Sequence, residues 1–122
     1  DLSQQKGKVV VLGFWATWSG PSIRNLPLLL EATREFNSSE LKLVSVNQDA
    51  SVKELLEFIN QYNLHELSIL LDENSSAYDA FDVKGLPHTV VIDQAGIVHD
   101  VAVGFSPFQG PDLKRMLTKL IK

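Results

Sequence analysis

The sequence predicts an α/β protein with a central mixed sheet flanked by helices. Short apolar runs that suit buried strands alternate with longer segments whose apolar residues recur at helical spacing. A helical segment between the first two strand candidates predicts a parallel pair, because a crossover of that kind joins parallel strands. A short turn joins the last two strand candidates and predicts an antiparallel hairpin. The sheet is therefore expected to contain both kinds of pairing.

The composition fits one compact domain over residues 1–122. With 44% hydrophobic residues, the chain is long enough to bury roughly two-thirds of the surface that its unfolded form exposes. The net charge of -4 and the lack of any long Lys/Arg run argue against a nucleic-acid or anionic-membrane partner. No apolar stretch has the length of a membrane span. Cysteine is absent, so disulfides give no clue to the redox compartment.

The first strand and the first helix are separated by a short loop. The run from Val9 to Leu12 is apolar and rich in β-branched residues, and it predicts a buried strand. Ser19 suits a helix N-cap and Pro21 suits the first turn, so a helix is expected over 21–36, with a kink at Pro27. The loop is thus a helix N-terminus, where unpaired N–H groups and the helix dipole would help a thiol to ionise.

The remaining elements follow in order along the chain. A strand at 41–46 is followed by a helix at about 51–62, which a capping box from Ser51 to Glu54 opens. A strand at Ile69 to Leu71 and a helix ending near Phe81 come next. Strands at 89–92 and 97–103 flank the turn 93–96, and Pro111 opens the last helix. The last helix carries an apolar stripe that is expected to join the core, namely Leu113, Met116, Leu117, Leu120 and Ile121.

The loop before the first helix resembles the redox motif of thioredoxins. Trp18-Ser19-Gly20-Pro21-Ser22 matches Trp-Cys-Gly-Pro-Cys with serine at both cysteine positions, and the surrounding phrases are closest to the TlpA/ResA-like branch of thiol-disulfide oxidoreductases. The resemblance implies a thioredoxin fold with a strand-helix insert at about 64–82. It also implies an extracytoplasmic location, on an anchor that is not present in this chain. Because the chain begins just before the first strand, we expect it to be part of a longer protein.

The resemblance also implies roles for individual residues. Ser19 and Ser22 stand at the positions of the attacking and resolving cysteines. The groove that would receive the thiols or disulfides of a partner protein is framed by Trp18, Gly20, Pro21, Leu86 and Pro87. Pro87, which directly precedes a strand, is implied to have a cis peptide bond. The protein is expected to be a monomer without a cofactor.

A buried acid is a further feature of the family. Thioredoxins commonly have an aspartate directly before the Phe-Trp pair, where this chain has Gly13. TlpA/ResA-like relatives use an acid after the second strand instead, and Asp49 is the nearest candidate for such an acid/base. We favour the simpler interpretation, in which Asp49 is a solvated loop residue that caps the next helix.

Histidine offers little sign of other chemistry. His65, His88 and His99 lie on separate elements without the paired spacing of a metal site, so no metal is predicted. His88 follows Pro87 and could serve as the base of a serine hydrolase. The sequence lacks a nucleophile-elbow glycine pattern, and both serines occupy cysteine positions of the family, so hydrolysis is disfavoured.

Serine at both motif positions removes the thiol chemistry, because both steps of disulfide exchange need sulfur. One hypothesis is a thiol-disulfide oxidoreductase in which Cys→Ser replacement, engineered or natural, has abolished exchange. The alternative is a thioredoxin-like module that binds an extended peptide beside Pro87 without catalysis. A third interpretation is a purely structural domain of a larger protein.

Overall fold

The computed structural model describes residues 7–49, 52–62, 68–104 and 109–121 and has a five-stranded sheet in the order β3-β2-β1-β4-β5. The strands are β1 (Val9–Trp15), β2 (Leu41–Asn47), β3 (Ile69–Leu71), β4 (His88–Ile92) and β5 (Val98–Val103). The helices are α1 (Gly20–Thr33), α2 (Val52–Tyr62), α3 (Ser76–Ala80) and α4 (Gln109–Ile121), with a 3-10 turn, η2, at Glu73–Ser75.

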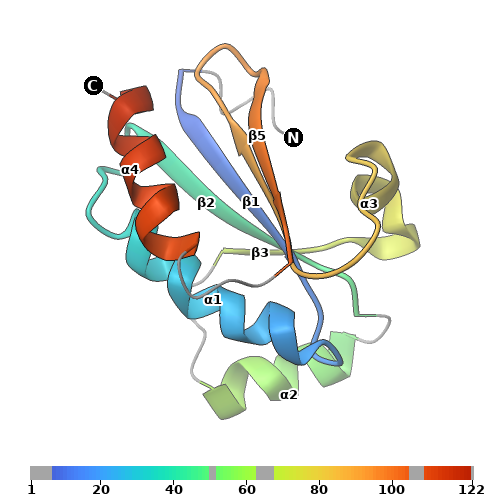
Figure 1. The fold of residues 1–122 in the computed structure, drawn as a ribbon. Coiled ribbons are helices and arrows are strands. Elements are labelled where there is room, and N and C mark those ends of the chain that lie inside the picture. Colours follow the sequence, from blue (N-terminus) through green and yellow to red (C-terminus); the bar gives the residue numbers. More distant parts are fainter. Residues whose placement is uncertain (1–6, 50–51, 63–67, 105–108, 122) are drawn as a thin grey trace.

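Strand β1 lies at the centre of the sheet and pairs on both sides. It is parallel to β2 and antiparallel to β4, and β4 forms an antiparallel hairpin with β5 (Figure 1). The predicted parallel pair, hairpin and mixed sheet are therefore confirmed. All seven residues of β1 are buried, as a strand with neighbours on both sides and both faces covered should be.

Helices cover both faces of the sheet. Helices α1 and α4 lie side by side over one face, α2 packs near the end of that face, and α3 lies over the other (Figure 1). Because side chains alternate along a strand, successive residues of β1 enter different clusters. The cluster under α1 and α4 contains Val9, Val11, Leu29, Ala32, Leu41, Val91, Leu113 and Leu117. The cluster under α3 contains Val10, Leu12, Phe14, Val46, Val83, Val90 and Ile92.

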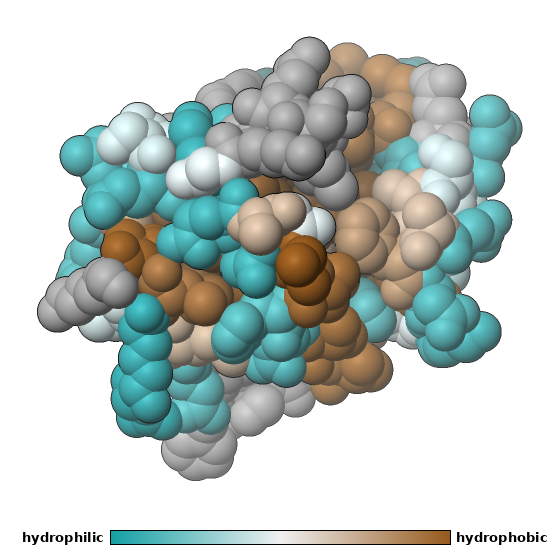
Figure 2. Space-filling model, turned by 90° about the horizontal axis from the view of Figure 1, so that it is seen from above, coloured by the Kyte–Doolittle hydropathy of each residue, from teal (hydrophilic) through white to brown (hydrophobic). Residues whose placement is uncertain are grey.

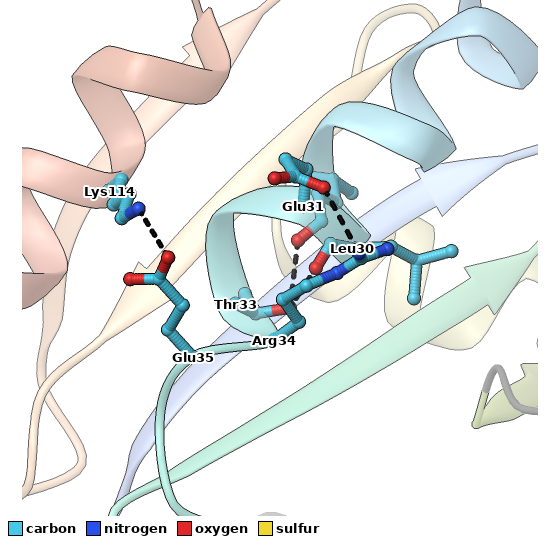
Figure 3. A network of polar contacts seen from close by, with 7 residues as sticks. Leu30, Glu31, Thr33, Arg34, Glu35 and Lys114 are labelled. Atoms are coloured by element: carbon cyan, nitrogen blue, oxygen red, sulfur yellow. Dashed lines mark hydrogen bonds and ion pairs between the residues drawn. The ribbon is translucent and has the colours of Figure 1, made fainter.

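Helix α1 is shorter than the predicted 21–36. It ends at Thr33, and Arg34 is the C-cap, whose backbone N–H donates to the Leu30 carbonyl. The Thr33 hydroxyl donates to carbonyls of the preceding turn (Figure 3). The Phe36 N–H donates to the Thr33 carbonyl, so the chain tightens instead of continuing the α-helix. Pro27 lies inside the helix, as predicted.

The segment after α1 is joined to α4 by an ion pair. Lys114 Nζ lies 2.8 Å from Glu35 Oε1, and Glu31 and Arg34 form a second pair across one helical turn (Figure 3). Both pairs are largely exposed, and such pairs contribute little to stability. The apolar stripe of α4 packs against the core as predicted, and it provides the main attachment of this helix.

Other elements fit the prediction closely. Strand β3 and helix α3 occupy the expected segments, and the turn before β5 is closed by the Asp93 carboxylate, which accepts from the backbone N–H groups of Ala95 and Ile97. The Ser51 capping box lies outside the described residues, as does the start of the expected insert at 64–67. Helix α4 begins at Gln109, two residues before the predicted Pro111.

Strand β5 forms one edge of the sheet and carries exposed apolar side chains. Figure 2 views the molecule from the end where β1 begins, and hydrophobic patches lie there between hydrophilic side chains. The exposed apolar residues on β5 and just before it are Ile97, Val98, Val101 and Val103. The Asp100 carboxylate accepts from the Val101 N–H at 2.9 Å and so satisfies a backbone donor of the edge strand, which disfavours pairing with another chain.

A close approach of α1 to the sheet occurs at Gly13. A Cβ atom at this position would lie 2.5 Å from Cδ1 of Leu29, whose side chain is itself packed in the core. The absence of a side chain at residue 13 thus sets how closely α1 lies on β1. This contact fixes the position of the loop that joins the two elements.

The buried carboxylate of Asp72 organises the start of α3. It accepts hydrogen bonds from the backbone N–H groups of Ala77 and Tyr78 and from the side chains of Gln48 and Ser76. Burial alone would raise the pKa of the Asp72 carboxyl, but these hydrogen bonds outweigh it and lower the pKa below its usual value. Ionised Asp72 therefore stabilises the folded state.

We expect Asp72→Asn to destabilise the protein by about 1–3 kcal/mol at neutral pH, because an amide replaces only part of these acceptor bonds. Since the folded pKa is depressed, the stabilisation is present above the unfolded value of about 3.9 and is lost as pH falls through the folded pKa. Urea unfolding of both proteins between pH 3 and pH 7 measures the difference. Asp79→Asn is the control, because the exposed Asp79 carboxylate makes no hydrogen bond within the described structure. An equal effect of both substitutions would contradict the expectation.

We expect Gly13→Ala to destabilise the protein by about 1–3 kcal/mol, because the new methyl group overlaps Leu29 in a packed core. Gly85→Ala is the matched control, since a Cβ there meets no described atom within 4 Å and should change stability by less than about 0.5 kcal/mol. Thermal and urea unfolding of the two variants give the comparison. Equal stability of the two variants would show that α1 can shift to accept the methyl group at no cost.

Candidate functional site

The two motif serines occupy the first turn of α1. Ser19 is the N-cap, as predicted, and its Oγ accepts from the Ser22 N–H at 3.4 Å. The Ser22 hydroxyl donates to the Ser19 carbonyl at 2.9 Å and accepts from the Ala16 N–H at 3.2 Å. Ser22 is fully buried, whereas Ser19 keeps 9% of its surface exposed. The outer and inner serines thus differ in access to solvent.

The residues flanking the serines lie at the surface. Trp18 is 70% exposed to solvent, and Gly20 and Pro21 are also exposed. A large aromatic side chain that is mostly in water next to a helix N-terminus is available for contact with another molecule. The motif therefore forms an accessible rim around Ser19.

The structure brings the Leu86-Pro87 segment to the same end of the sheet. His88, which follows Pro87, pairs with Phe14 of β1, so Pro87 lies level with the point where β1 leads into the motif loop. The Leu86-Pro87 peptide bond is cis. Pro87 is buried and Leu86 is half-buried, and the Pro87 carbonyl accepts from the Gly104 N–H at 2.9 Å.

Asp49 is buried, which corrects the favoured interpretation of a solvated loop residue. Only 5% of Asp49 is exposed. Its carboxylate accepts from the Thr17 hydroxyl at 2.7 Å, from the Thr17 N–H at 3.1 Å and from the Asn47 amide at 2.9 Å. The side chain turns inward because Thr17 of the motif loop and Asn47 of β2 supply these donors. Asp49 therefore holds the loop that precedes the serines.

Gly13 directly precedes the Phe-Trp pair and lies against α1. A Cβ here would lie 2.5 Å from Cδ1 of Leu29, so a side chain could enter only if Leu29 shifted. The buried carboxylate nearest the motif loop comes from Asp49, at the end of β2, instead.

Sequence reasoning missed three polar contacts beside the site. Thr17 and Asn47 position the Asp49 carboxylate, and Asn25 of α1 donates from Nδ2 to Thr89 Oγ1 of β4 at 3.3 Å. The position of Asn47 at the carboxyl end of a buried strand was the one available signal, because polar side chains there tend to line functional loops. Nothing in the spacing of Thr17 or Asn25 indicated their partners.

His88 does not act on the serines in this structure. Its side chain is buried in the cluster under α3, and neither ring nitrogen has a hydrogen-bond partner among the described residues. The serine-hydrolase interpretation therefore gains no support.

Within the described part of the chain, no group of three or more metal-ligating side chains is arranged around a common point. None of the described helices combines the length and hydrophobicity of a membrane span.

Comparison with known proteins gives consistent similarities. A model of the AhpC/TSA family matches residues 1–101. The thiol-disulfide oxidoreductase ResA of Bacillus subtilis is 34% identical over 104 residues, covering 85% of this chain and 58% of ResA. The thioredoxin-like protein YneN of the same organism is 33% identical over 107 residues, covering 85% of this chain and 61% of YneN. The chain thus spans about three-fifths of the length of these relatives.

Among solved structures, a protein from Chlorobium tepidum described as a candidate thiol:disulfide interchange protein DsbE superimposes with a TM-score of 0.90. The two are 29% identical, and the match covers 99% of this chain and 85% of the other. The similarities in sequence and structure confirm the resemblance to ResA-like proteins and the thioredoxin fold.

We expect Asp49→Ala to destabilise the protein by about 1–3 kcal/mol, because the Thr17 N–H and the Asn47 amide lose a buried acceptor. Thr17→Val removes only the hydroxyl bond and should cost less. Urea unfolding of both single variants and the double variant forms a cycle, with an expected coupling of about 0.5–3 kcal/mol. Additive effects of the two substitutions would contradict a direct bond between these side chains.

Proposed function

Because this chain belongs to the AhpC/TSA family, we propose that it is the thioredoxin-like domain of a ResA-type thiol-disulfide oxidoreductase in a form that lacks the reactive sulfurs. Ser19 takes the position of the attacking cysteine and Ser22 that of the resolving cysteine. The observation that carries this proposal is the pair of serines in the first turn of α1, one partly accessible and one fully buried.

The surroundings of Ser19 suit a nucleophilic sulfur. A group at the helix N-cap receives the Ser22 N–H, and the helix dipole favours negative charge there. A thiol at such a place ionises at about pH 3.5–7.5 instead of about 8.5. The 9% exposure of Ser19, beside the open Trp18, allows a partner's disulfide to approach. A cysteine at residue 19 would thus be the sulfur that attacks.

The buried residue 22 suits the second step. A thiolate there would attack the mixed disulfide between residue 19 and the partner, and the partner would leave with its second sulfur reduced. Asp49 is our candidate for the acid/base that handles the proton of this thiol. Its carboxylate bonds to Thr17, which neighbours the Ala16 N–H that contacts the Ser22 hydroxyl.

The groove between the motif and the Pro87 segment is the proposed binding site for protein substrates. Trp18, Gly20 and Pro21 form one rim, and Leu86 and Pro87 form the other. An extended segment of a partner protein that carries a thiol or disulfide is the class of substrate. The proposed domain acts as a monomer without metal or nucleic acid, on the outer side of the cytoplasmic membrane, as the resemblance implies.

As the sequence stands, the chain cannot carry out this exchange. A serine hydroxyl is a weak nucleophile at neutral pH without an adjacent base, and two hydroxyls cannot form a reversible bond that stores two electrons as a disulfide does. The described residues supply no hydrogen-bonded base to Ser19. The fold and the groove are thus retained while the redox step is missing.

We expect the combined substitution Ser19→Cys and Ser22→Cys to give a protein that reduces or oxidises a protein disulfide at rates like those of thioredoxins, because it restores both sulfurs in the first turn of α1. Turnover of a disulfide-bonded protein substrate and equilibration with glutathione measure the gain. The unchanged chain should show no exchange in either assay.

The single substitutions are the matched controls. Ser19→Cys alone should form a mixed disulfide that is not released, and Ser22→Cys alone should react slowly because residue 22 is buried. A folded double variant that forms neither a disulfide nor a mixed disulfide would contradict the proposal and would favour a module that only binds peptides.

A further inference from the structure

His88 is a titratable side chain in an apolar environment. It is 5% exposed and lies in β4 between Phe14 of β1 and Val103 of β5. The Phe14 ring meets it edge-on, with centroids 5.9 Å apart and planes at 81°. Neither Nδ1 nor Nε2 has a hydrogen-bond partner among the described residues. The ring therefore fills space in the core without any polar compensation.

This environment accepts the neutral ring far better than the charged one. A neutral imidazole leaves one buried N–H unpaired, whereas the protonated ring would bury a full charge and two unpaired donors. Burial accordingly lowers the pKa of His88, and the opposing effect of Asp82, which raises it, is smaller. Asp82 is at the surface and already paired with Lys84 at 2.9 Å.

Few other charged or titratable groups face the ring. From α3, Tyr78 packs against the same cluster, and Asp79 on that helix is exposed. Strand β1 contributes the uncharged Phe14. On β5, His99 and Asp100 are exposed and lie several residues away from Val103, the residue paired with His88. Apart from the smaller effect of Asp82, no described group is thus arranged to stabilise a proton on the ring.

The backbone links the ring to one wall of the groove. His88 directly follows Pro87, whose carbonyl accepts from the Gly104 N–H. Leu86, on the other side of Pro87, packs against the same cluster as His88. The position of the Leu86-Pro87 segment therefore depends on the ring remaining in the core. A ring that moves toward water must displace this segment.

We propose that His88 is a proton-sensitive anchor of the Leu86-Pro87 wall, which packs the wall at neutral pH and lets it open locally more often in mildly acidic surroundings. The proposal extends the proposed function by adding control over the groove. It does not rest on thiol exchange, because the ring, Pro87 and Gly104 are present in the serine chain. Its failure and that of the exchange proposal can therefore be told apart.

The first experiment measures unfolding of the unchanged chain and of His88→Phe in urea at pH 7.5 and pH 5.5. The unfolded ring takes up a proton with a pKa of about 6.5, so the folding equilibrium constant of the unchanged chain should fall between these pH values, by up to about 10-fold when the folded ring stays neutral. The folded pKa is lowered, so this loss develops as pH falls below the unfolded value. His88→Phe should change less than about 2-fold, since no proton is involved.

The second experiment follows hydrogen exchange at single backbone amides, corrected for the chemical exchange rate at each pH. In the unchanged chain, the Gly104 amide should lose protection at pH 5.5 more strongly than the central Val90 amide, because its acceptor is Pro87. In His88→Phe the two amides should keep the same ratio at both pH values. His99→Gln, at an exposed position of β5, should behave like the unchanged chain.

A folding equilibrium constant that stays within 2-fold between the two pH values would overturn the proposal. Equal loss of protection at Gly104 and Val90 would overturn it too, because the wall would then not respond separately from the rest of the sheet. If His88→Phe does not fold, His88→Leu takes its place. The NMR titration of the His88 ring in the unchanged chain, which needs no variant, should give a folded-state pKa below the ordinary value, and an ordinary titration at about 6.5 would also refute the proposal.

Discussion

The close packing of α1 on β1 at Gly13 is the constraint on which the site depends. A strand buried on both faces and a helix that approaches it without an intervening side chain leave the connecting loop little freedom. The loop must pass from the end of β1 to the first turn of α1, and Ser19 and Ser22 are held in that turn. The pairing of β4 with β1 then brings the Pro87 segment to the same end of the sheet. The geometry of the site thus follows from the core beneath it.

Most of the fold could be predicted from the sequence because its signals are local. Apolar runs, helix caps and turn residues indicated each strand and helix, and the connection lengths indicated the mixed sheet. The end of α1 could not be predicted in this way, since the apolar spacing continues to Phe36 while side-chain and backbone bonds at Thr33 tighten the chain. A periodic pattern tells which residues face the core and does not tell where the helical hydrogen bonds stop.

The candidate site was predicted less completely. The motif identified both serines and the proline segment, because these residues stand in a recognisable order. The burial of Asp49 could not be predicted, since its donors are on Thr17, far away in the sequence, and on Asn47, in a strand that looks ordinary. Asp72 resembles an ordinary loop acid in the same way, although it holds the start of α3. A carboxylate is buried when distant parts of the chain supply its donors, which a local reading of the sequence does not reveal.

The hydrogen bonds of Ser22 show what this turn of the helix needs. The hydroxyl donates to the Ser19 carbonyl and accepts from the Ala16 N–H, so an oxygen is well accommodated where a sulfur would form only weak bonds. The helix N-terminus therefore keeps its geometry with oxygen at residue 22. The shape of the turn does not require sulfur, whereas disulfide exchange does.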